Sequence, residues 1–434
     1  MMTLKPLGLA LCALSLATPL IWFPAIAQGR DAVALFSQYL GIWALIAMAL
    51  AQIISTRLTP VEALFGGLDR AYVLHKWLGI GAMVAILLHD TIDAEMRGLG
   101  QETLLVEVAE TAGELSLYGL LILVVITIAT FIPYHLWRWT HRLMGAFFTA
   151  GAFHYLAILK PFDNGDPLGL YTGVFCILGI LAFAYRLLPS HLRPSRRYDV
   201  TAVTRTGNAL AIDMRPNGRG IKAQPGQFAF FQFEGEAPHP FTLSALVAPD
   251  GSLRISMARL GDATHRLHHR LQAGAKVQVE GAYGRFNRPR GAKRELWIAG
   301  GIGITPFLAW AAAKQDETPV DLVYCVRSAD SAAHLEELHT LAANAPNLTL
   351  HLHESASAGR LTTEALLDKT KADPRDLHVA YCGPSALREA LQKGLSKRGL
   401  SQRRFHYELF EIRTGIGLRK LAAHLQKRIT ERNV

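Results

Sequence analysis

Apolar residues dominate the first part of the chain in six long runs. They lie at roughly residues 7–27, 39–56, 73–89, 116–134, 142–159 and 169–188. A helix needs about 20 consecutive apolar residues to cross a bilayer, so the pattern predicts six membrane-spanning helices. The third and fifth runs are short or polar at one end, and both contain histidines.

After about residue 198 the pattern changes to short segments in which apolar and polar residues alternate, such as 209–214 and 227–233. This alternation predicts an antiparallel β-barrel. From residue 295 apolar strands are followed by glycine turns and helical stretches, which predicts an open parallel sheet with helices on its faces. The expected fold is a multi-domain membrane protein with a six-helix transmembrane bundle, an antiparallel β-barrel and an α/β parallel-sheet domain.

Charged residues are concentrated in the second half of the chain. Of the 45 Lys/Arg and 35 Asp/Glu residues, 10 and 12 lie in residues 1–190, which leaves 35 and 23 in the other 244 residues. Soluble proteins have about 25% charged residues, so only the first part is poor enough in charge to lie in lipid. The composition excludes a disordered, collagen-like or disulfide-scaffold chain. The four cysteines are scattered, which argues against a disulfide or a cysteine-based zinc site.

Arginines and acids occupy alternate loops between the apolar runs. Cytoplasmic loops carry an excess of Lys and Arg, so both termini and the second half are expected in the cytoplasm, with the chain in the cell (inner) membrane. An alternative for the first run is a signal peptide ending at Ala25-Ile26-Ala27, and its cleavage stays open. The basic loops contain Arg57, Arg70, Arg138, Arg142, Arg186, Arg193, Arg196 and Arg197, and the acidic ones Asp90, Asp93, Glu95, Glu102, Glu107, Glu110, Glu114, Asp163 and Asp166.

Four histidines lie at matched depths in two of the predicted spans. His75 and His89 are 14 residues apart, almost four helical turns, so both rings face one side about 21 Å apart along the axis. His141 and His154 are 13 residues apart, which on an ideal helix turns their rings about 140° from each other. This span is therefore expected to bend, bulge or re-aim its rings, with Gly145 or Gly151 as the expected position.

Spans three and five run in the same direction, so His75 can face His141 and His89 can face His154. Two pairs of facing imidazoles predict two bis-histidine haems stacked across the bilayer. The alternative is that these are polar side chains satisfied within a helix bundle. His135, close to Trp137 and Trp139, is interpreted as an interfacial residue.

Two motifs in the second half indicate nucleotide binding. The turn Gly300-Gly301-Ile302-Gly303 between a strand and a helix lets backbone amides approach a pyrophosphate, although glycines also serve other tight turns. The segment His239-Pro-Phe-Thr-Leu-Ser offers a flat apolar surface and two hydroxyls for a polar ring edge. Alone, it is also compatible with a strand entering a turn.

Together these residues resemble the ferric reductase / NADPH oxidase superfamily of the bacterial type, over all but the last 20 or so residues. The resemblance implies a six-span haem b domain fused to a ferredoxin–NADP reductase-like module. The expected domains are a six-span haem domain (1–192), an FAD-binding β-barrel (193–292), an NAD(P)H-binding α/β domain (293–413) and a basic amphipathic tail (414–434). The implied cofactors are two haems b, FAD and NADPH, with NADH as the alternative.

The resemblance also implies site residues. The family's turn beside the nicotinamide matches Cys382, and its flavin-stacking aromatic matches Phe410, next to Glu408 and Glu411. The family usually has proline where this chain has Ala282. Haem iron is assigned to His75, His89, His141 and His154; the flavin ring to His239, Pro240, Phe241, Thr242 and Ser244; its diphosphate to Gly261, Asp262, Thr264, Gly281 and Gly284; and the pyridine nucleotide to Gly300, Gly301, Gly303, Thr305, Pro306, Arg327, Ser328, Cys382, Gly383 and Pro384.

The expected function is electron transfer from cytoplasmic NAD(P)H through FAD and two haems to an acceptor on the outer side. Seven acids against one arginine in residues 90–114 favour ferric ions or cationic chelates, unless these acids are merely solvated. Oxygen, a quinone and a periplasmic protein remain alternative acceptors. A non-catalytic haem-binding scaffold is the alternative from another class.

Expected partners are membrane lipid and a small acceptor, with no nucleic acid, because no motif for nucleic acid occurs. The tail repeats Leu418, Leu421, Leu425 and Ile429 at helical spacing between basic residues. It is interpreted as a surface helix on anionic lipid, a helix docked on another domain or a frayed end. The oligomeric state and any protein partner stay open.

Overall fold

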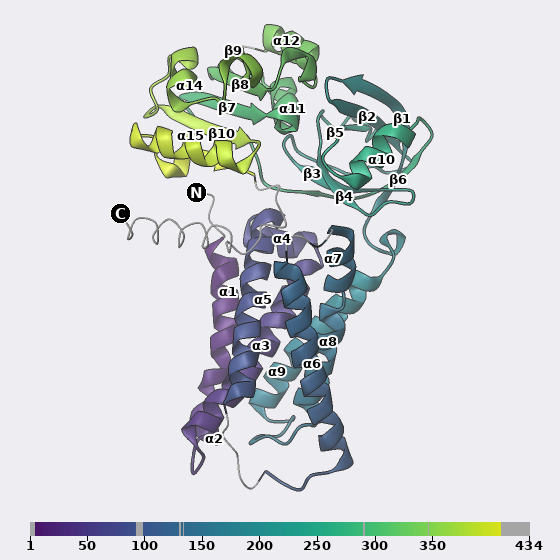
Figure 1. Cartoon of the computed structure of the whole chain (residues 1–434), viewed down its shortest axis with the longest axis vertical. Coiled ribbons are helices and arrows are strands. Elements are labelled where there is room, and N and C mark those ends of the chain that lie inside the picture. Colours follow the sequence, from purple (N-terminus) through teal and green to yellow (C-terminus); the bar gives the residue numbers. More distant parts are fainter. Residues whose placement is uncertain are drawn as a thin grey trace, which may run out of the picture. The chain divides into compact units, whose positions relative to one another are not determined.

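The computed structural model describes residues 5–92, 99–129, 132, 134–289, 291–345 and 347–408 (Figure 1). These residues form two compact units, an N-terminal unit up to Leu188 and a C-terminal unit from Pro189. The predicted tail 414–434 and the aromatic Phe410 lie outside the described residues.

The N-terminal unit is entirely helical. Its longest helices, α3, α5, α6 and α9, are the ones that pack the unit together, with α3 against α5 and α9, and α6 against α8. The helices are α1 (Pro6–Ala17), α2 (Phe23–Ile26), α3 (Ala32–Ser55), α4 (Thr59–Phe65), α5 (Leu68–Thr91), α6 (Leu104–Ile128), α7 (Tyr134–His141), α8 (Met144–Ala157) and α9 (Pro167–Leu187).

Five helical segments among the described residues are long and apolar enough to cross a membrane, namely 6–26, α3, α5, α6 and α9. The segment expected as the fifth span, 142–159, contains only the 14-residue helix α8. It does not form one continuous helix with α7, because the chain turns at Arg142 and Leu143. The amide of Leu143 bonds to the carbonyl of Thr140 (2.9 Å), three residues back, and so leaves the α-helical register.

This turn provides the break that the 13-residue histidine spacing requires. His141 ends α7, and His154 lies on the separate helix α8. We predicted the break near Gly145 or Gly151, which was wrong: both glycines lie inside α8. They serve close packing instead, since a β-carbon on Gly145 would lie 2.0 Å from the Phe183 ring and one on Gly151 2.9 Å from the Ser116 hydroxyl.

The fourth span starts earlier than the hydropathy pattern predicted. Helix α6 begins at Leu104, where the Thr103 side chain accepts a hydrogen bond from the Val106 amide (3.4 Å). The acidic stretch up to residue 114 is therefore helical in its second half rather than a loop. Val106 and Ala109 are buried, whereas Glu107, Glu110 and Glu114 are exposed, so the acids do not interrupt the packed face.

The C-terminal unit starts with a six-stranded antiparallel sheet in the order β4-β3-β6-β1-β2-β5. A bridge between Leu243 and Ile255 joins the ends of the order, so the sheet curls into a barrel. Alternate strand residues such as Ile212, Phe231, Ile255 and Val279 fill its core. The strands are β1 (Arg196–Thr206), β2 (Ala209–Pro216), β3 (Phe228–Phe233), β4 (His239–Thr242), β5 (Leu253–Ala258) and β6 (Lys276–Tyr283), and helix α10 (Asp262–Arg270) follows β5.

A five-stranded parallel sheet in the order β11-β10-β7-β8-β9 completes the unit. The order reverses between β7 and β10, and open α/β sheets bind ligands at such switch points, beyond the carboxyl ends of the strands. The strands are β7 (Arg294–Gly300), β8 (Val320–Val326), β9 (Leu348–Glu354), β10 (Leu377–Cys382) and β11 (Phe405–Tyr407), and the main helices are α11 (Thr305–Ala313), α12 (Leu335–Asn344), α14 (Thr363–Thr370) and α15 (Ser385–Lys397).

Candidate functional site

The four histidines of the N-terminal unit lie in two pairs. The imidazoles of His75 on α5 and His141 on α7 have ring centroids 6.2 Å apart. Two imidazoles that bind one metal ion from opposite sides through bonds of about 2 Å have centroids roughly 6 Å apart. His89 and His154 lie near enough for their charges to interact. All four histidines are partly buried in the helical unit.

Every one of these rings is oriented by a hydrogen bond at Nδ1. His75 Nδ1 bonds to the Ala51 carbonyl (2.9 Å) and His154 Nδ1 to the Ala109 carbonyl (2.9 Å). Because a carbonyl only accepts, Nδ1 carries the proton in both rings and Nε2 presents its lone pair. Metal-binding histidines have this arrangement, in which the second nitrogen donates to an outer group.

Nδ1 of the remaining two rings, His89 and His141, also lies next to hydrogen-bond acceptors. His89 Nδ1 lies 2.9 Å from the Ser37 carbonyl and 2.8 Å from the Ser37 hydroxyl. His141 Nδ1 lies 3.4 Å from the Thr127 hydroxyl, whose own proton goes to the Leu123 carbonyl. Helix α3 thus supports both histidines of α5, and α6 supports the other two. The residues fit two haem irons held through Nε2 of each pair.

Glycines make room for the rings of His89 and His154. A β-carbon on Gly113 would lie 2.7 Å from His154 Nδ1, and one on Gly41 would lie 3.4 Å from His89 Nε2. Each glycine follows the hydrogen-bond acceptor, Ala109 or Ser37, by four residues, which is one helical turn. The histidine spacing did not predict these glycines or acceptors. Two small residues one helical turn apart on a neighbouring span are the sequence pattern that would indicate them.

The flavin motif forms β4 at one edge of the barrel sheet. His239 pairs with Phe231 and Thr242 with Phe228 of β3. Thr242 is buried and Pro240 is exposed. Ser244 is fully buried, and its hydroxyl accepts hydrogen bonds from Ser256 (2.9 Å) and Arg254 (3.3 Å). The Ser244 hydroxyl therefore already has two protein partners.

The proposed diphosphate segment lies at the start of α10. Gly261 is the N-cap residue, and the Thr264 hydroxyl accepts hydrogen bonds from the Leu260 amide (3.1 Å) and the Gly261 amide (3.0 Å). Gly261, Asp262 and Thr264 are not buried. The first turn of a helix favours anions, so a phosphate can approach these residues.

Strand β3 lies between β4, which carries the flavin motif, and the end of β6, which is followed by Gly284. Phe228 pairs with Thr242 on one side and with Tyr283 on the other. A β-carbon on Gly284 would lie 2.9 Å from the Phe228 ring and 3.3 Å from the Glu408 carboxylate. The segment after β11 thus reaches the barrel at this point.

Cys382 belongs to the same neighbourhood. It ends β10, and burial together with the nearby charge of Glu408 raises the pKa of its thiol. The thiol therefore stays protonated at neutral pH and does not act as a thiolate nucleophile.

The nucleotide loop and the Cys382 turn touch at the switch point of the parallel sheet. A β-carbon on Gly303 would lie 2.2 Å from the Cys382 carbonyl oxygen, and one on Gly300 would lie 2.7 Å from Pro384. A β-carbon on Gly383 would lie 3.0 Å from the Gly300 backbone. Only glycines allow these two loops to pack backbone against backbone. Thr305 and Pro306 open α11 directly after the loop and are buried, so they hold the loop rather than face solvent.

Arg327 and Ser328 follow β8 at the same edge. Arg327 is exposed, and the Ser328 amide donates a hydrogen bond to the Ser331 hydroxyl (3.1 Å). The Glu354 carboxylate accepts from the neighbouring Ala329 amide (2.8 Å). An arginine at this position is available for a phosphate, beside a carboxylate that is already hydrogen bonded.

A buried polar network joins the barrel to the parallel-sheet domain. Arg254 of β5 donates to Glu337 (2.6 Å) at the start of α12, and Ser256 bonds to His334 (2.7 Å). His334 Nδ1 in turn bonds to Glu337 (2.7 Å). Burial raises the pKa of Glu337, but the hydrogen bonds from His334 and Arg254 outweigh it and lower the pKa to about 2. This network, which sequence reasoning did not identify, connects Ser244 of the flavin motif to the nucleotide domain.

Three family models match the chain along its length. The ferric reductase like transmembrane component covers residues 40–152, the FAD-binding domain covers 195–296 and the oxidoreductase NAD-binding domain covers 297–393. Together the three matches have the domain order of the ferric reductase / NADPH oxidase-like fusions. The chain therefore combines a ferric reductase like transmembrane domain with FAD-binding and NAD-binding oxidoreductase domains.

Curated relatives match part of the chain. The carnitine monooxygenase reductase subunit of Escherichia coli is 33% identical over 35% of this chain and 46% of its own length. A flavohemoprotein of Pseudomonas putida is 30% identical over 44% of this chain and 52% of its own. The chain thus spans about half the length of these relatives.

Among solved structures, the FAD/NAD-binding domain of a nitric oxide dioxygenase from Vibrio cholerae is similar, with 24% identity and a TM-score of 0.45. The match covers 50% of this chain and 99% of that one. A flavohemoglobin from Malassezia yamatoensis has 16% identity and a TM-score of 0.49, over 91% of this chain and 98% of that one.

Proposed function

We propose that this reductase transfers electrons from NAD(P)H through FAD and two bis-histidine haems to an acceptor on the opposite side of the membrane. The observation that carries the proposal is the pair His75 and His141, whose ring centroids are 6.2 Å apart. The Nδ1 hydrogen bonds at all four histidines support it, because they leave each Nε2 free to bind iron.

The proposed residues divide the work between the two units. His75 with His141, and His89 with His154, hold one haem each. α5 carries His75 and His89 at an axial separation of about 21 Å, so the two irons lie at different depths. In this proposal α7 and α8 together make the fifth crossing, and the C-terminal unit lies in the cytoplasm.

A bound flavin accepts two electrons as a hydride and passes them on singly to a one-electron carrier. This proposal is supported by two contacts of Glu408, whose carboxylate lies next to Gly284 and close to the Cys382 thiol. The Gly300–Gly303 loop beside the Cys382 turn is the proposed seat of the nucleotide. Phe410 is proposed to stack on the flavin, two residues after Glu408.

We propose ferric iron or a ferric chelate as the acceptor. Glu107, Glu110 and Glu114 are exposed along the first turns of α6, on the helix that holds His154 through Ala109. Clustered carboxylates attract cations and raise their local concentration. Oxygen is the second candidate, since a haem with two histidine ligands transfers electrons from its edge without binding the acceptor at iron.

The test replaces His89 with leucine in the full-length protein. We expect one of two haems to be lost and reduction of an external acceptor to cease, while NADPH still reduces a soluble dye through FAD. A His89→Leu variant that retains two haems per chain would refute the ligand assignment. Reduction that depends on added ferric citrate would favour iron, and reduction sensitive to superoxide dismutase would favour oxygen.

A further inference from the structure

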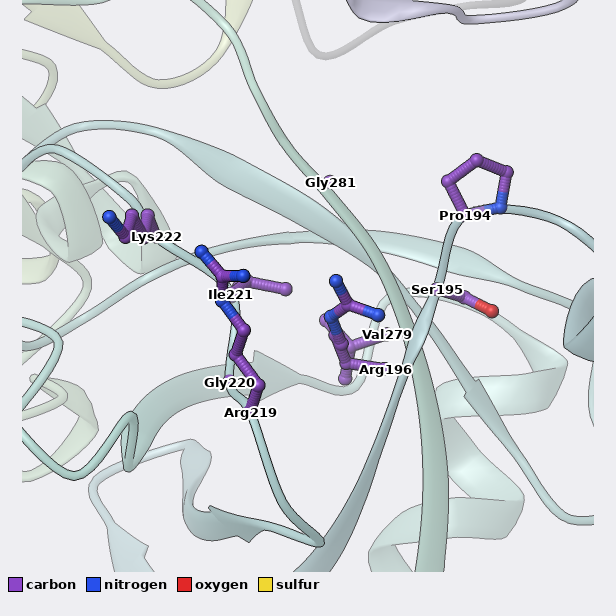
Figure 2. A pocket seen from close by; sticks show the side chains of 9 residues that line it. All are labelled: Pro194, Ser195, Arg196, Arg219, Gly220, Ile221, Lys222, Val279 and Gly281. Carbon is purple, nitrogen blue, oxygen red and sulfur yellow. The ribbon is translucent and has the colours of Figure 1, made fainter.

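A pocket of about 270 Å³ on the barrel is lined by three basic side chains (Figure 2). Arg196 comes from the start of β1, and Arg219 and Lys222 from the loop between β2 and β3. Figure 2 shows Arg196 and Arg219 on two sides of the same space. Val279 and Gly281 of β6 form the wall behind them.

The charge of this basic pocket is not neutralised by the protein. Within the described part of the chain, no carboxylate lies at ion-pair distance from Arg196, Arg219 or Lys222. Glu280, the acid next to Val279, pairs with Arg193 (3.0 Å) and accepts a hydrogen bond from the Tyr283 hydroxyl (3.1 Å). The pocket therefore presents three positive charges to a ligand.

The loop that carries two of these cations is fixed in place. The buried Tyr198 hydroxyl accepts a hydrogen bond from the Ile221 amide (2.8 Å) and donates one to the Gly251 carbonyl (3.1 Å). A β-carbon on Gly220 would lie 2.9 Å from the Gly251 α-carbon. Because the loop is held at Gly220 and Ile221, the backbone that carries Arg219 and Lys222 is fixed before a ligand binds, which lowers the entropic cost of binding.

The pocket lies close in the chain to the end of a candidate membrane span. α9 ends at Leu187, and Pro194 at the rim of the pocket is seven residues later. Seven residues reach at most about 25 Å when fully extended. The Ser195 hydroxyl donates to the Ser190 carbonyl (2.7 Å) and the Arg193 carbonyl (3.0 Å), so the connecting segment is folded and shorter than this limit.

The strand register separates this pocket from the start of α10, where Gly261, Asp262 and Thr264 of the proposed flavin diphosphate site lie, whereas Gly281, which the resemblance assigns to the same site, lines the pocket. The start of β1 pairs with the end of β2, at Tyr198 and Pro216. α10 follows the end of β5, where Ala258 pairs with Ala209 at the start of β2. The pocket and the start of α10 are thus at opposite ends of the barrel strands.

We propose that the basic pocket binds a phosphate group, supplied by the headgroup of an anionic phospholipid in the membrane that α9 crosses. Arginine side chains bind phosphate oxygens through paired N–H groups. Cations beside a membrane span attract anionic lipid. Such a lipid fixes the barrel at the membrane surface, independently of whether the proposed haem sites are correct.

The test uses purified full-length protein in detergent, titrated with short-chain phosphatidylglycerol and followed by native mass spectrometry. The variant carries Arg196→Gln, Arg219→Gln and Lys222→Gln. The matched control carries Arg205→Gln, Arg215→Gln and Lys276→Gln, three exposed cations of the same barrel that do not line the pocket. At about fivefold for each cation, we expect the first variant to bind roughly a hundredfold more weakly and the control to be unchanged.

Parallel titrations with phosphatidylcholine and inorganic phosphate distinguish the sources. We expect no specific adduct with phosphatidylcholine and much weaker binding of phosphate. The proposal is overturned if both triple variants lose lipid equally, or if inorganic phosphate binds as tightly as the lipid. It is also overturned if the pocket variant loses FAD, because the cations then belong to the flavin site.

Discussion

The glycine beside His154 offers a direct test of the proposed haem site at His89 and His154. In Gly113→Ala the new β-carbon would lie 2.7 Å from His154 Nδ1, against 3.4 Å for the shortest ordinary contact. The imidazole or α6 must therefore move by at least 0.7 Å. Either movement disturbs the hydrogen bond from His154 Nδ1 to the Ala109 carbonyl (2.9 Å).

The size of the effect follows from two independent estimates. Forcing an extra methyl group into a packed site costs about 1–3 kcal/mol, which corresponds to roughly 5–150-fold in a binding constant. Loss of an outer hydrogen bond to a metal-binding histidine costs about 10–100-fold in metal affinity. We expect one of the two haems to bind about ten- to a hundredfold more weakly.

The assay measures haem transfer from the purified full-length protein to apomyoglobin, with haem counted per chain before the challenge. Gly173→Ala in α9 is the matched control, because nothing lies within 4 Å of its new β-carbon. Wild-type retention in Gly113→Ala would refute the placement of a haem at His154. Equal loss of haem from the Gly173→Ala control would attribute the effect to the helices in general.

Three further predictions concern the C-terminal unit. Gly303→Ala places a β-carbon 2.2 Å from the Cys382 carbonyl oxygen. We therefore expect kcat/KM for NADPH to fall at least about tenfold while bound FAD is retained. Loss of FAD instead would contradict the assignment of this loop to the nucleotide. Arg327→Gln should raise KM for NADPH at least about tenfold and leave KM for NADH nearly unchanged, and an equal rise for both would show that Arg327 does not bind a 2′-phosphate. Hydrogen bonds hold the pKa of Glu337 at about 2, below its ordinary 4.5, so the stabilisation it gives is complete above pH 4.5 and is lost as the pH falls toward 2. Allowing for partial exposure, Glu337→Gln should cost about 1–2 kcal/mol at neutral pH and lower the Tm by roughly 3–8 °C, measured by release of flavin fluorescence, and a Tm gap that does not narrow between pH 5 and pH 3.5 would contradict this.

Histidine spacing predicted how the helices of the N-terminal unit face one another. Fourteen residues between His75 and His89 predict two rings on one side of α5. The 13-residue interval between His141 and His154 predicted a bend, a bulge or re-aimed rings, and the structure has a break between α7 and α8. The position of the break was not predictable from glycine, because Gly145 is occupied in packing against Phe183. Helix α6 was placed too late because hydropathy treats Glu107 and Glu110 as loop residues, although they lie on its exposed face.

Contacts between distant segments were beyond the reach of sequence patterns. The acceptors Ala51 and Ala109 use backbone carbonyls, which leave no trace in residue type. The bonds from Ser244 through Ser256 to His334 join residues up to 90 positions apart. Glycine motifs, by contrast, were informative because Gly300 and Gly303 have no room for a β-carbon, a constraint that only glycine satisfies.

Haem quantification on the purified full-length chain, followed by anaerobic addition of NADPH, tests the central claim most directly. The account predicts two low-spin b-type haems and one FAD per chain, with both haems reduced by NADPH only when FAD is present. A chain expressed with ample haem that has no Soret absorption, or whose haems stay oxidised after NADPH has reduced the flavin, would contradict it.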